Sequence, residues 1–244
     1  MSRAATGDMD RAARPGGSGR RARTGGRGDK PAAIERAACE VFARDGYTRA
    51  GIDAIAAAAG ASTRTLYNHF PGGKEELFRT VVQWSAGRVR EAQLALLARY
   101  LDPERPPRAA DLERDLLALA RACAGLMAES RDHFALVGHI HAEAGHLPDE
   151  VFEAWQEAGP RAVARGYAAA MAALEEAGLL DTHGDPARAA AHFAALTSTD
   201  LAQRTSWGVR PLPQAETERL LASGVAAFLR AYAAGGPRPE SARG

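Results

Sequence analysis

Residues 52–70, with the sequence IDAIAAAAGASTRTLYNHF, decide how the rest of the chain can be arranged. Three apolar residues in the first half have the i, i+3, i+4 spacing of a buried helical face: Ile52, Ile55 and Ala56. Gly60 then allows a sharp turn, because glycine adopts backbone conformations that are closed to other residues. Ser62 is a suitable N-cap, since its hydroxyl can accept a hydrogen bond from the first turn of a following helix. The pattern therefore predicts two short helices, of which the second covers residues 63–70.

The second predicted helix has an apolar and a polar side. Steps of roughly 100° per residue place Leu66 and Phe70 together, where they can pack on the first helix. The polar residues lie on the other side, with Arg64 and Asn68 at its centre and Thr65 and Tyr67 beside them. Two short helices joined by a glycine-containing turn form a helix-turn-helix, whose second helix places its N-terminal residues against base edges of DNA. An ordinary helical hairpin with a solvated polar side is the alternative interpretation.

The flanking sequences extend this pattern. IERAACEVFARDGY occupies residues 34–47, and LYNHFPGGKEELF occupies residues 66–78. With the central stretch, residues 31–78 strongly resemble the DNA-binding domain of the TetR family of bacterial transcriptional regulators. The polar side of the helix and this resemblance together give the expected DNA-binding residues: Ser62, Thr63, Arg64, Thr65, Tyr67, Asn68, His69 and Lys74.

The stretch departs from the usual family pattern at three places. Ala50 and Gly51 stand where the family usually has Thr or Ser, so Gly51 is expected to act as a weaker cap. The residues after Phe70 place Lys74 one position later than the commonest spacing. Arg64 stands where the family often has Gly or Pro, and we expect it to contact guanine O6 and N7. A phosphate contact by Arg64 is the alternative, while Lys74 is expected to hold a phosphate.

Composition indicates an all-α globular protein. Of 244 residues, 46% are hydrophobic and 25% are charged, and alternating strand-like runs are absent from the sequence. No apolar run reaches the roughly 18 residues that span a bilayer, and the polar N-terminus does not look like a signal peptide, so we expect a cytoplasmic protein. Cys39 and Cys123 have neither metal-ligand nor disulfide spacing.

The chain is expected to divide into four parts. Residues 1–30 hold eight basic and three acidic residues with few large apolar ones, which predicts a disordered basic arm that either stays solvated or follows DNA. Residues 31–78 would form a three-helix DNA-binding domain, residues 79–234 a larger helical domain, and residues 235–244 a flexible tail. Helix punctuation by Pro and Gly predicts helices over residues 31–45, 74–101, 111–130, 131–144, 148–158, 160–177, 185–207 and 214–233.

The second half carries a weaker resemblance. HAEAGHLPDEVFEAW, at residues 141–155, and later runs such as DPARAAAHFAAL are similar to the effector-binding and dimerisation domain of AefR-like TetR regulators. This resemblance implies a homodimer that binds double-stranded operator DNA and a small apolar or amphipathic effector. Aromatic and Met residues on the predicted helices are effector-pocket candidates, although apolar residues at helical spacing are individually more often core than ligand contacts: Trp84, Met127, Phe134, Trp155, Tyr167 and Met171.

Two apolar stripes in residues 185–233 are candidates for the dimer interface. They comprise Phe193, Leu196, Leu221, Val225, Phe228, Leu229 and Tyr232. The alternative is that they form the internal core of a monomer.

Other function classes are less favoured by the sequence. His139 and Glu143 are four residues apart and could share a helical face, which leaves a metal sensor or helical enzyme as an alternative. No nucleophile elbow or phosphate-binding loop is present in the sequence, so we expect neither catalysis nor a cofactor. A DNA-binding architectural protein without an effector is a further alternative. The favoured hypothesis is a transcriptional regulator, and specifically a repressor that an effector releases from its operator.

Overall fold

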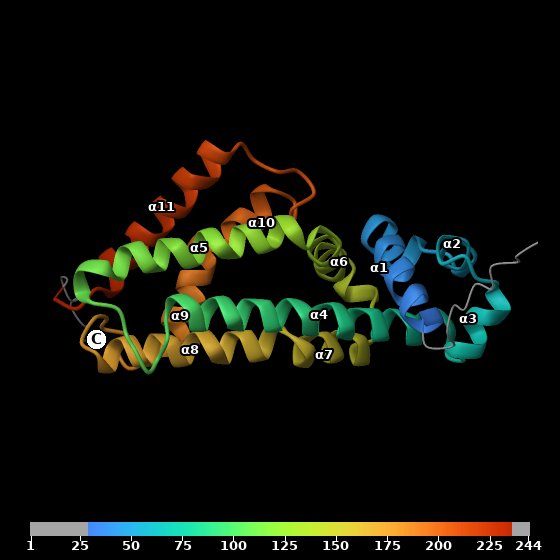
Figure 1. Ribbon diagram of the computed structural model, residues 1–244, viewed down its shortest axis with the longest axis horizontal. Helices are drawn as coiled ribbons and strands as arrows, with labels where there is room; N and C mark the ends of the chain where they lie inside the picture. Colours follow the sequence, from blue (N-terminus) through green and yellow to red (C-terminus); the bar gives the residue numbers. More distant parts are fainter. Residues whose placement is uncertain (1–28, 236–244) are drawn as a thin grey trace, which may run out of the picture.

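A computed structural model describes residues 29–235 of the chain. Within this range the regular elements are helices, apart from an isolated antiparallel bridge between Leu180 and Ala233, so the all-α prediction is confirmed. The molecule is elongated, with three N-terminal helices at one end and a larger group of helices beyond them (Figure 1). Most of the predicted basic arm and C-terminal tail lies outside the described residues.

The N-terminal helices are α1 (Asp29–Arg49), α2 (Ile52–Ala58) and α3 (Thr63–His69). α1 is broken at Gly46, where the backbone has φ 76° and ψ 175°, so the predicted end of the first helix marks a real interruption. Gly51 precedes α2 without a side-chain cap, whereas the Ser62 hydroxyl accepts a hydrogen bond from Thr65 N at 3.1 Å at the start of α3. Leu66 is fully buried and fixes α3 on the other two helices.

The helix α4 (Gly73–Tyr100) joins the N-terminal helices to the rest of the molecule. With 28 residues it extends over roughly 42 Å at 1.5 Å per residue. It runs without interruption along the larger helical group (Figure 1). The predicted boundary between residues 78 and 79 therefore lies within a continuous helix that belongs to both parts.

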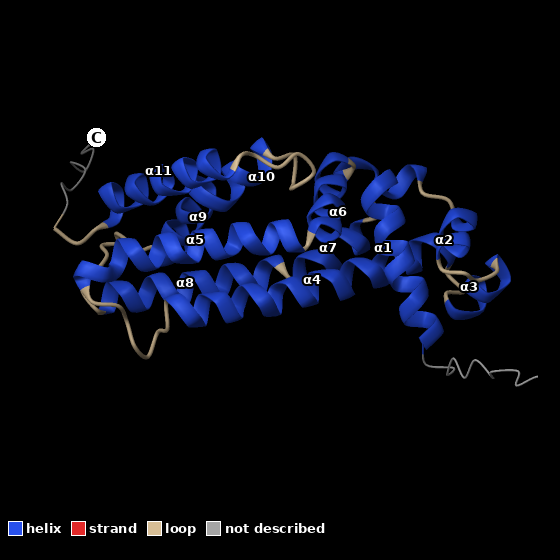
Figure 2. Cartoon of the chain, turned by 45° about the horizontal axis from the view of Figure 1, so that its top comes forward, coloured by secondary structure: helices blue, strands red, loops and turns tan. Residues whose placement is uncertain are grey.

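The remaining helices follow the predicted positions closely. They are α5 (Leu112–Glu129), α6 (Arg131–Ala142), α7 (Asp149–Ala158), α8 (Pro160–Glu176), α9 (Pro186–Ala194), α10 (Asp200–Arg204) and α11 (Gln214–Tyr232), with single 3-10 turns at Ala109–Asp111 and Ala144–His146. A long loop separates α10 from α11 (Figure 2).

The helix expected over residues 185–207 is continuous from Pro186 to Arg204, but its middle, Ala195–Thr199, is a π-helical segment between α9 and α10. Within this segment the buried Thr197 hydroxyl donates to Phe193 O at 2.7 Å. The segment also packs against α11 at Gly224, where an added Cβ would overlap Leu196 O. Hydroxyl bonding and close backbone contact both favour a local departure from α-helical geometry.

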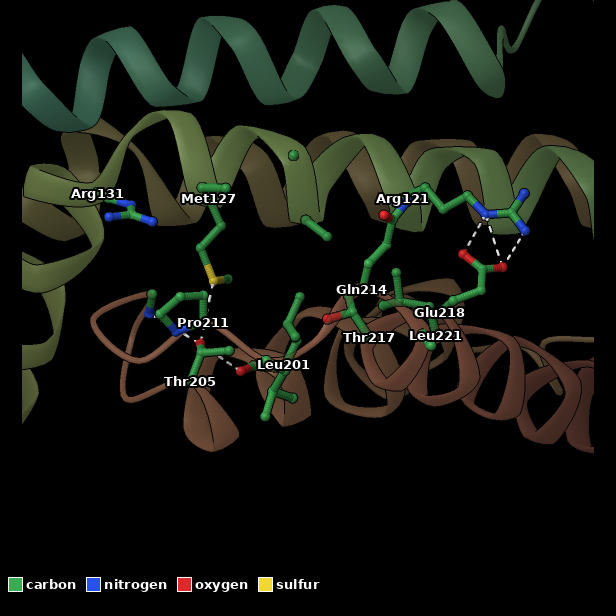
Figure 3. A pocket seen from close by; sticks show the side chains of 16 residues that line it. Arg121, Met127, Arg131, Leu201, Thr205, Pro211, Gln214, Thr217, Glu218 and Leu221 are labelled. Carbon is green, nitrogen blue, oxygen red and sulfur yellow. Dashed lines mark hydrogen bonds and ion pairs between the residues drawn. The ribbon is translucent and has the colours of Figure 1, made fainter.

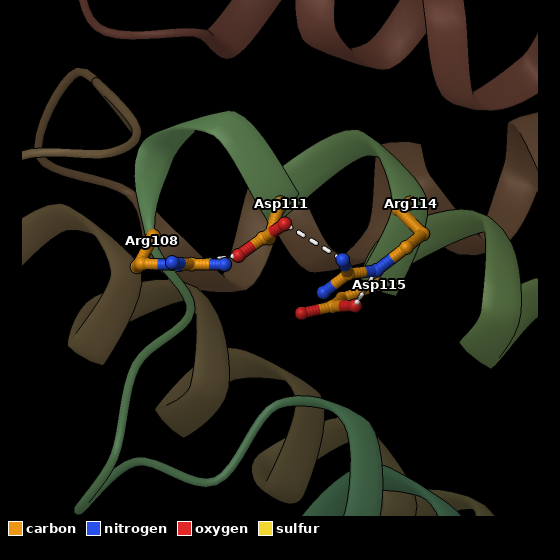
Figure 4. A network of polar contacts seen from close by, with 4 residues as sticks. All are labelled: Arg108, Asp111, Arg114 and Asp115. Atoms are coloured by element: carbon orange, nitrogen blue, oxygen red, sulfur yellow. Dashed lines mark hydrogen bonds and ion pairs between the residues drawn. The ribbon is translucent and has the colours of Figure 1, made fainter.

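An exposed polar network surrounds the start of α5 (Figure 4). Arg108 and Arg114 each place a guanidinium nitrogen 2.7 Å from the Asp111 carboxylate, and Arg114 also lies 2.9 Å from Asp115. The Arg108 hydrogen bond helps to hold the pKa of Asp111 below its usual value. Exposed ion pairs of this kind contribute little stability, so the network chiefly fixes how the preceding loop enters α5.

Two buried apolar clusters form the interior. The first joins α1–α3 to α4, α6 and α7, with Phe42, Phe78, Leu136 and Trp155 among its members. The N-terminal helices are thus packed onto α6 and do not form a separate core. The second cluster joins α4, α5, α8, α9 and α11.

This second cluster contains five of the seven residues expected at a dimer interface: Phe193, Leu221, Val225, Phe228 and Tyr232. The predicted apolar stripes therefore exist, and these five side chains are buried within the single chain. Leu196 is 37% exposed and Leu229 is partly buried, so only these two retain surface.

Candidate nucleic-acid interface and ligand cavity

The polar side of α3 faces solvent at one end of the molecule (Figure 1). Arg64, Asn68 and His69 are exposed, and Tyr67 is 50% exposed, while Leu66 on the opposite side is buried. Within the described residues, the Arg64 guanidinium has no hydrogen bond or ion pair. A long donor-rich side chain is thus available at the first turn of an exposed helix.

Two of the hydroxyl groups that we expect to contact DNA already have partners within the first turn of α3. Ser62 Oγ and Thr65 Oγ1 lie 2.8 Å apart, in addition to the capping bond that Ser62 accepts from Thr65 N. Thr63 is half-buried beside them. These three residues therefore lie where α3 begins, and Arg64 and Asn68 are exposed beyond them.

Lys74 lies in the first turn of α4, shortly after α3 ends. Its Nζ donates to Thr48 O at 3.1 Å and sits 4.8 Å from the centroid of the Tyr47 ring. Burial lowers the pKa of the Lys74 ammonium. The ammonium is engaged with α1 in this structure, and a phosphate contact would need a rotation of the side chain.

The end of α6 is bonded to α1 on both sides of the Gly46 break. The Glu143 carboxylate accepts from Thr48 N at 3.0 Å and from Thr48 Oγ1 at 2.8 Å. His139 Nε2 lies 3.1 Å from Ala43 O. An added Cβ at Gly46 would overlap Glu143 Oε1 and lie 2.9 Å from His139 Nδ1, so only glycine fits between the helices. We refer to Gly46, Thr48, His139 and Glu143 as the α1–α6 junction.

This junction also shows what the His139 and Glu143 side chains contact. Their side chains are 3.7 Å apart, but each is engaged with α1, and His141 points elsewhere toward Trp155 and Trp207. Among the described residues, no group of three His, Cys, Asp or Glu side chains is arranged to hold a metal ion. The sequence resemblance included Gly46 and Glu143, but nothing in the spacing showed that residues 97 positions apart meet.

A cavity of about 600 Å³ lies among α4, α6, α7, α8 and α9, and we call it the α4–α8 cavity. Three predicted pocket residues line it: Phe134, Trp155 and Tyr167. His141 and Trp207 also line it, and neither was predicted. Their rings are stacked at 4.9 Å between centroids, and His141 meets Trp155 edge-on at 5.3 Å. Burial lowers the pKa of His141, which favours the neutral ring.

Polar groups reach the same cavity from several helices. Arg90, Gln93, Gln156 and Arg165 line it, and Arg90 Nη1 also donates to Ala158 O at 2.9 Å. The Tyr167 hydroxyl lies 3.2 Å from Cys123 Sγ, and burial raises the pKa of that phenol. An apolar aromatic wall with a few polar groups is typical of a small-molecule site.

The other three predicted pocket residues lie elsewhere. Trp84 lines a cavity of about 520 Å³ between α1, α4 and α6, and the Arg88 guanidinium carbon sits 5.2 Å from the centroid of the Trp84 ring. Met127 lines a third cavity, of about 1050 Å³, beside α5. Met171 is fully buried in the second apolar cluster. Helical periodicity identified all three as inward-facing but could not show which inner space each one faces.

Comparison with known proteins places both halves of the chain in one family. Residues 34–81 match the family model of bacterial regulatory proteins of the tetR family, and residues 114–234 match that of the AefR-like transcriptional repressor C-terminal domain. No curated protein matches the chain closely enough to count as a relative. Among residues 29–235, no helix is long and apolar enough to cross a membrane.

Solved structures agree with the family models. A TetR-family transcriptional regulator from Mesorhizobium loti is 29% identical, with 84% of this chain and 98% of that chain covered and a TM-score of 0.71. The flavonoid-responsive regulator FrrA is 31% identical, with coverage of 87% and 100% and a TM-score of 0.58. SmeT, the repressor of the multidrug efflux pump SmeDEF of Stenotrophomonas maltophilia, shares the fold at 20% identity, with coverage of 87% and 95% and a TM-score of 0.58.

One conclusion follows from the helix-turn-helix with its exposed α3, from the two family matches, and from the agreement over the length of FrrA. The chain belongs to the TetR family of transcriptional regulators and is a sequence-specific DNA-binding repressor that a small-molecule effector releases from its operator.

Proposed function

We propose that this repressor is a homodimer that reads a palindromic operator through α3 and responds to a planar amphipathic molecule in the α4–α8 cavity. The observation that carries the proposal is the double role of α6. Phe134, Val137 and His141 of this helix line the cavity, whereas His139 and Glu143 bind α1. A ligand that shifts α6 must therefore act on the helices that support α3.

DNA reading is assigned to the exposed side of α3. Arg64 is free of intramolecular partners among the described residues, and its length allows a bidentate contact with guanine O6 and N7. Asn68 lies on the same side and can assist at a neighbouring base. Tyr67 and His69 are exposed on α3 and Lys74 follows at the start of α4, and we assign these three residues to contacts with phosphates that fix the register of the protein on DNA.

The dimer is assigned to the outward side of α9–α11, in place of the buried stripe. A shallow groove of about 630 Å³ crosses this side between the π-helical segment and α11, with Leu196, Leu220 and Ala227 among its apolar members. Two helices that present small and apolar residues on one side can form a four-helix interface with a second copy. A strictly monomeric mass at micromolar concentration, with intact operator binding, would rule this out.

The effector class follows from the aromatic wall of the α4–α8 cavity. Trp155, His141 and Trp207 offer ring faces and edges that pack favourably against a flat aromatic ligand, while Arg165 and Gln156 can bind its polar substituents. FrrA, which is 31% identical to this chain, is described as flavonoid-responsive. We infer that a flavonoid-like molecule suits the cavity.

The test combines an operator recovered from random DNA with the flavonoid quercetin. Fluorescence anisotropy of the labelled operator is measured with the full chain, with and without quercetin. Quercetin should weaken operator binding by a factor limited by its differential affinity for the two states of the protein. Trp155→Leu should lose most of this response while retaining operator affinity without ligand.

Trp84→Leu is the control, because Trp84 is a partly buried tryptophan that packs on the same apolar cluster as the buried Trp155 but lines a different cavity. It should respond to quercetin as the wild type does. If Trp155→Leu responds like the wild type, the effector site is not the α4–α8 cavity. If quercetin binds the wild type without any change in operator affinity, that molecule does not act as an effector.

A further inference from the structure

The third cavity, which Met127 lines, lies between α5 and α11, and we call it the α5–α11 cavity (Figure 3). Its volume is about 1050 Å³, larger than that of the α4–α8 cavity. Met127, Leu201, Pro211 and Leu221 give it an apolar lining. No residue lines both cavities, so the two spaces are separate.

The α5–α11 cavity stays open because α5 presents small residues to it. Ala124, Gly125 and Ala128 line this side, and a Cβ added at Gly125 would meet no atom within 4 Å. Larger side chains at these positions would fill the space between the helices. The chain therefore leaves room for a molecule where close packing of α5 against α11 would otherwise be expected.

Contacts at both ends hold the two sides of the cavity together. The Arg121 guanidinium forms a bidentate ion pair with Glu218 across α5 and α11 at one end (Figure 3). At the other end, the buried Thr205 hydroxyl lies 4.0 Å from Met127 Sδ. The space is thus framed by side chains of the chain itself.

The charges around the cavity are unequal at its two ends. Glu218 neutralises Arg121, and this ion pair holds the pKa of the Glu218 carboxyl below its usual value. Arg131 lies at the opposite end of the view in Figure 3 and has no hydrogen bond or ion pair among the described residues. A ligand anion would therefore find its available cation at Arg131.

We propose that the α5–α11 cavity is a second small-molecule site, which takes an elongated apolar molecule with one anionic end placed at Arg131. The apolar lining binds the body of the molecule by removing it from water. The unpaired Arg131 guanidinium binds the anionic end and so sets the orientation of the molecule in the cavity. This site is independent of the flavonoid proposal, because it uses other residues and another ligand chemistry.

The strained turn at the end of α10 links this site to the first cavity. Ser206 and Trp207 have φ of 50° and 60°, values that non-glycine residues adopt only when their surroundings hold them. Thr205 and Gly208 on either side line the α5–α11 cavity, while Trp207 lines the α4–α8 cavity. An occupant of the α5–α11 cavity is therefore expected to change the environment of the Trp207 indole.

Dodecanoate, below its micellar concentration, is the probe for this site. Its binding to the full-length protein is measured by calorimetry and by tryptophan fluorescence. Gly125→Phe should remove the binding, because the new ring occupies the cavity without meeting protein atoms at its Cβ. Gly87→Phe is the matched control, since Gly87 is also a helical glycine with open space at its Cβ but lines none of the three cavities.

Arg131→Gln tests the charge with a substitution on the surface, where folding is not at risk. It should weaken dodecanoate binding about fivefold, the size expected for one exposed ion pair, and leave dodecyltrimethylammonium binding unchanged. Dodecanoate bound equally well by Gly125→Phe and wild type would overturn the site, as would an absence of binding to the wild type. Equal dodecanoate affinity of Arg131→Gln and wild type would overturn the placement of the anionic end at Arg131. Loss of dodecanoate binding by Gly125→Phe, with an intact quercetin response, would support the α5–α11 site independently of the flavonoid proposal.

Discussion

The substitution Gly46→Ala tests the α1–α6 junction. Gly46 has φ 76° and ψ 175°, a region that is essentially restricted to glycine, and forcing alanine into it costs about 1–3 kcal/mol. The added Cβ also overlaps Glu143 Oε1, so the carboxylate must move away from Thr48. Losing its two hydrogen bonds adds about 1–2 kcal/mol, reduced from the buried value because Thr48 is exposed.

The total loss of stability is about 3 kcal/mol. For a protein of this size, each kcal/mol lowers the melting temperature by about 2–4 °C, so we expect a decrease of about 10 °C by circular dichroism. The double-mutant cycle with Glu143→Ala separates the two contributions. In the Glu143→Ala background the overlapping carboxylate is absent, and Gly46→Ala should cost only about 2 kcal/mol.

A cost below about 1 kcal/mol for Gly46→Ala, or strict additivity with Glu143→Ala, would refute the close approach of α6 to α1. Arg44→Ala is a suitable control on the same helix, because Arg44 is exposed and pairs only with its neighbour Asp45. Its effect on the free energy of unfolding should be within about 0.5 kcal/mol of zero.

Three further predictions concern single side chains. Ser62→Ala removes the cap of α3 and should lower the free energy of unfolding by about 1 kcal/mol, measured by urea denaturation; an unchanged midpoint would contradict the capping role. Lys74→Gln should weaken binding to every DNA sequence alike and reduce the slope of log affinity against log salt by about one, whereas an unchanged slope would exclude a phosphate contact. Burial lowers the pKa of His133 from 6.5 to about 4, so the folded state binds its proton less readily than the unfolded state. Stability should therefore fall by up to about 3 kcal/mol as the pH drops from 6.5 to 4, and His133→Asn should remove most of that fall in denaturation curves taken across this range.

Much of the fold could be predicted from local sequence. Pro and Gly mark helix starts and ends through their own backbone preferences, so most predicted helices agree with the structure within a few residues. The π-helical segment could not be predicted in this way, because it depends on the contact between Leu196 and Gly224 of another helix. A local pattern carries no information about such a distant contact.

The candidate sites, too, could be predicted only where they depend on local sequence. The outward side of α3 follows from its own periodicity, since Leu66 must be buried and Arg64 lies opposite. The predicted dimer stripe was also correctly recognised as apolar, but periodicity cannot distinguish a partner chain from the chain's own core. Trp207 was missed as a cavity residue because a strained turn, which no helical pattern predicts, directs it there.

DNA reading through α3 is tested most directly by selecting bound DNA from a random pool, in parallel with the wild-type chain and Arg64→Ala. The wild type should enrich a two-fold symmetric sequence whose half-site centres lie about 34–36 Å, or a multiple of this distance, apart. Arg64→Ala should bind that sequence more weakly by about 1–3 kcal/mol and lose its preference at one symmetry-related position in each half-site. Recovery of no enriched sequence by the wild type would contradict DNA reading through α3. Recovery of the same sequence with unchanged preference at every position by Arg64→Ala would contradict the role assigned to Arg64.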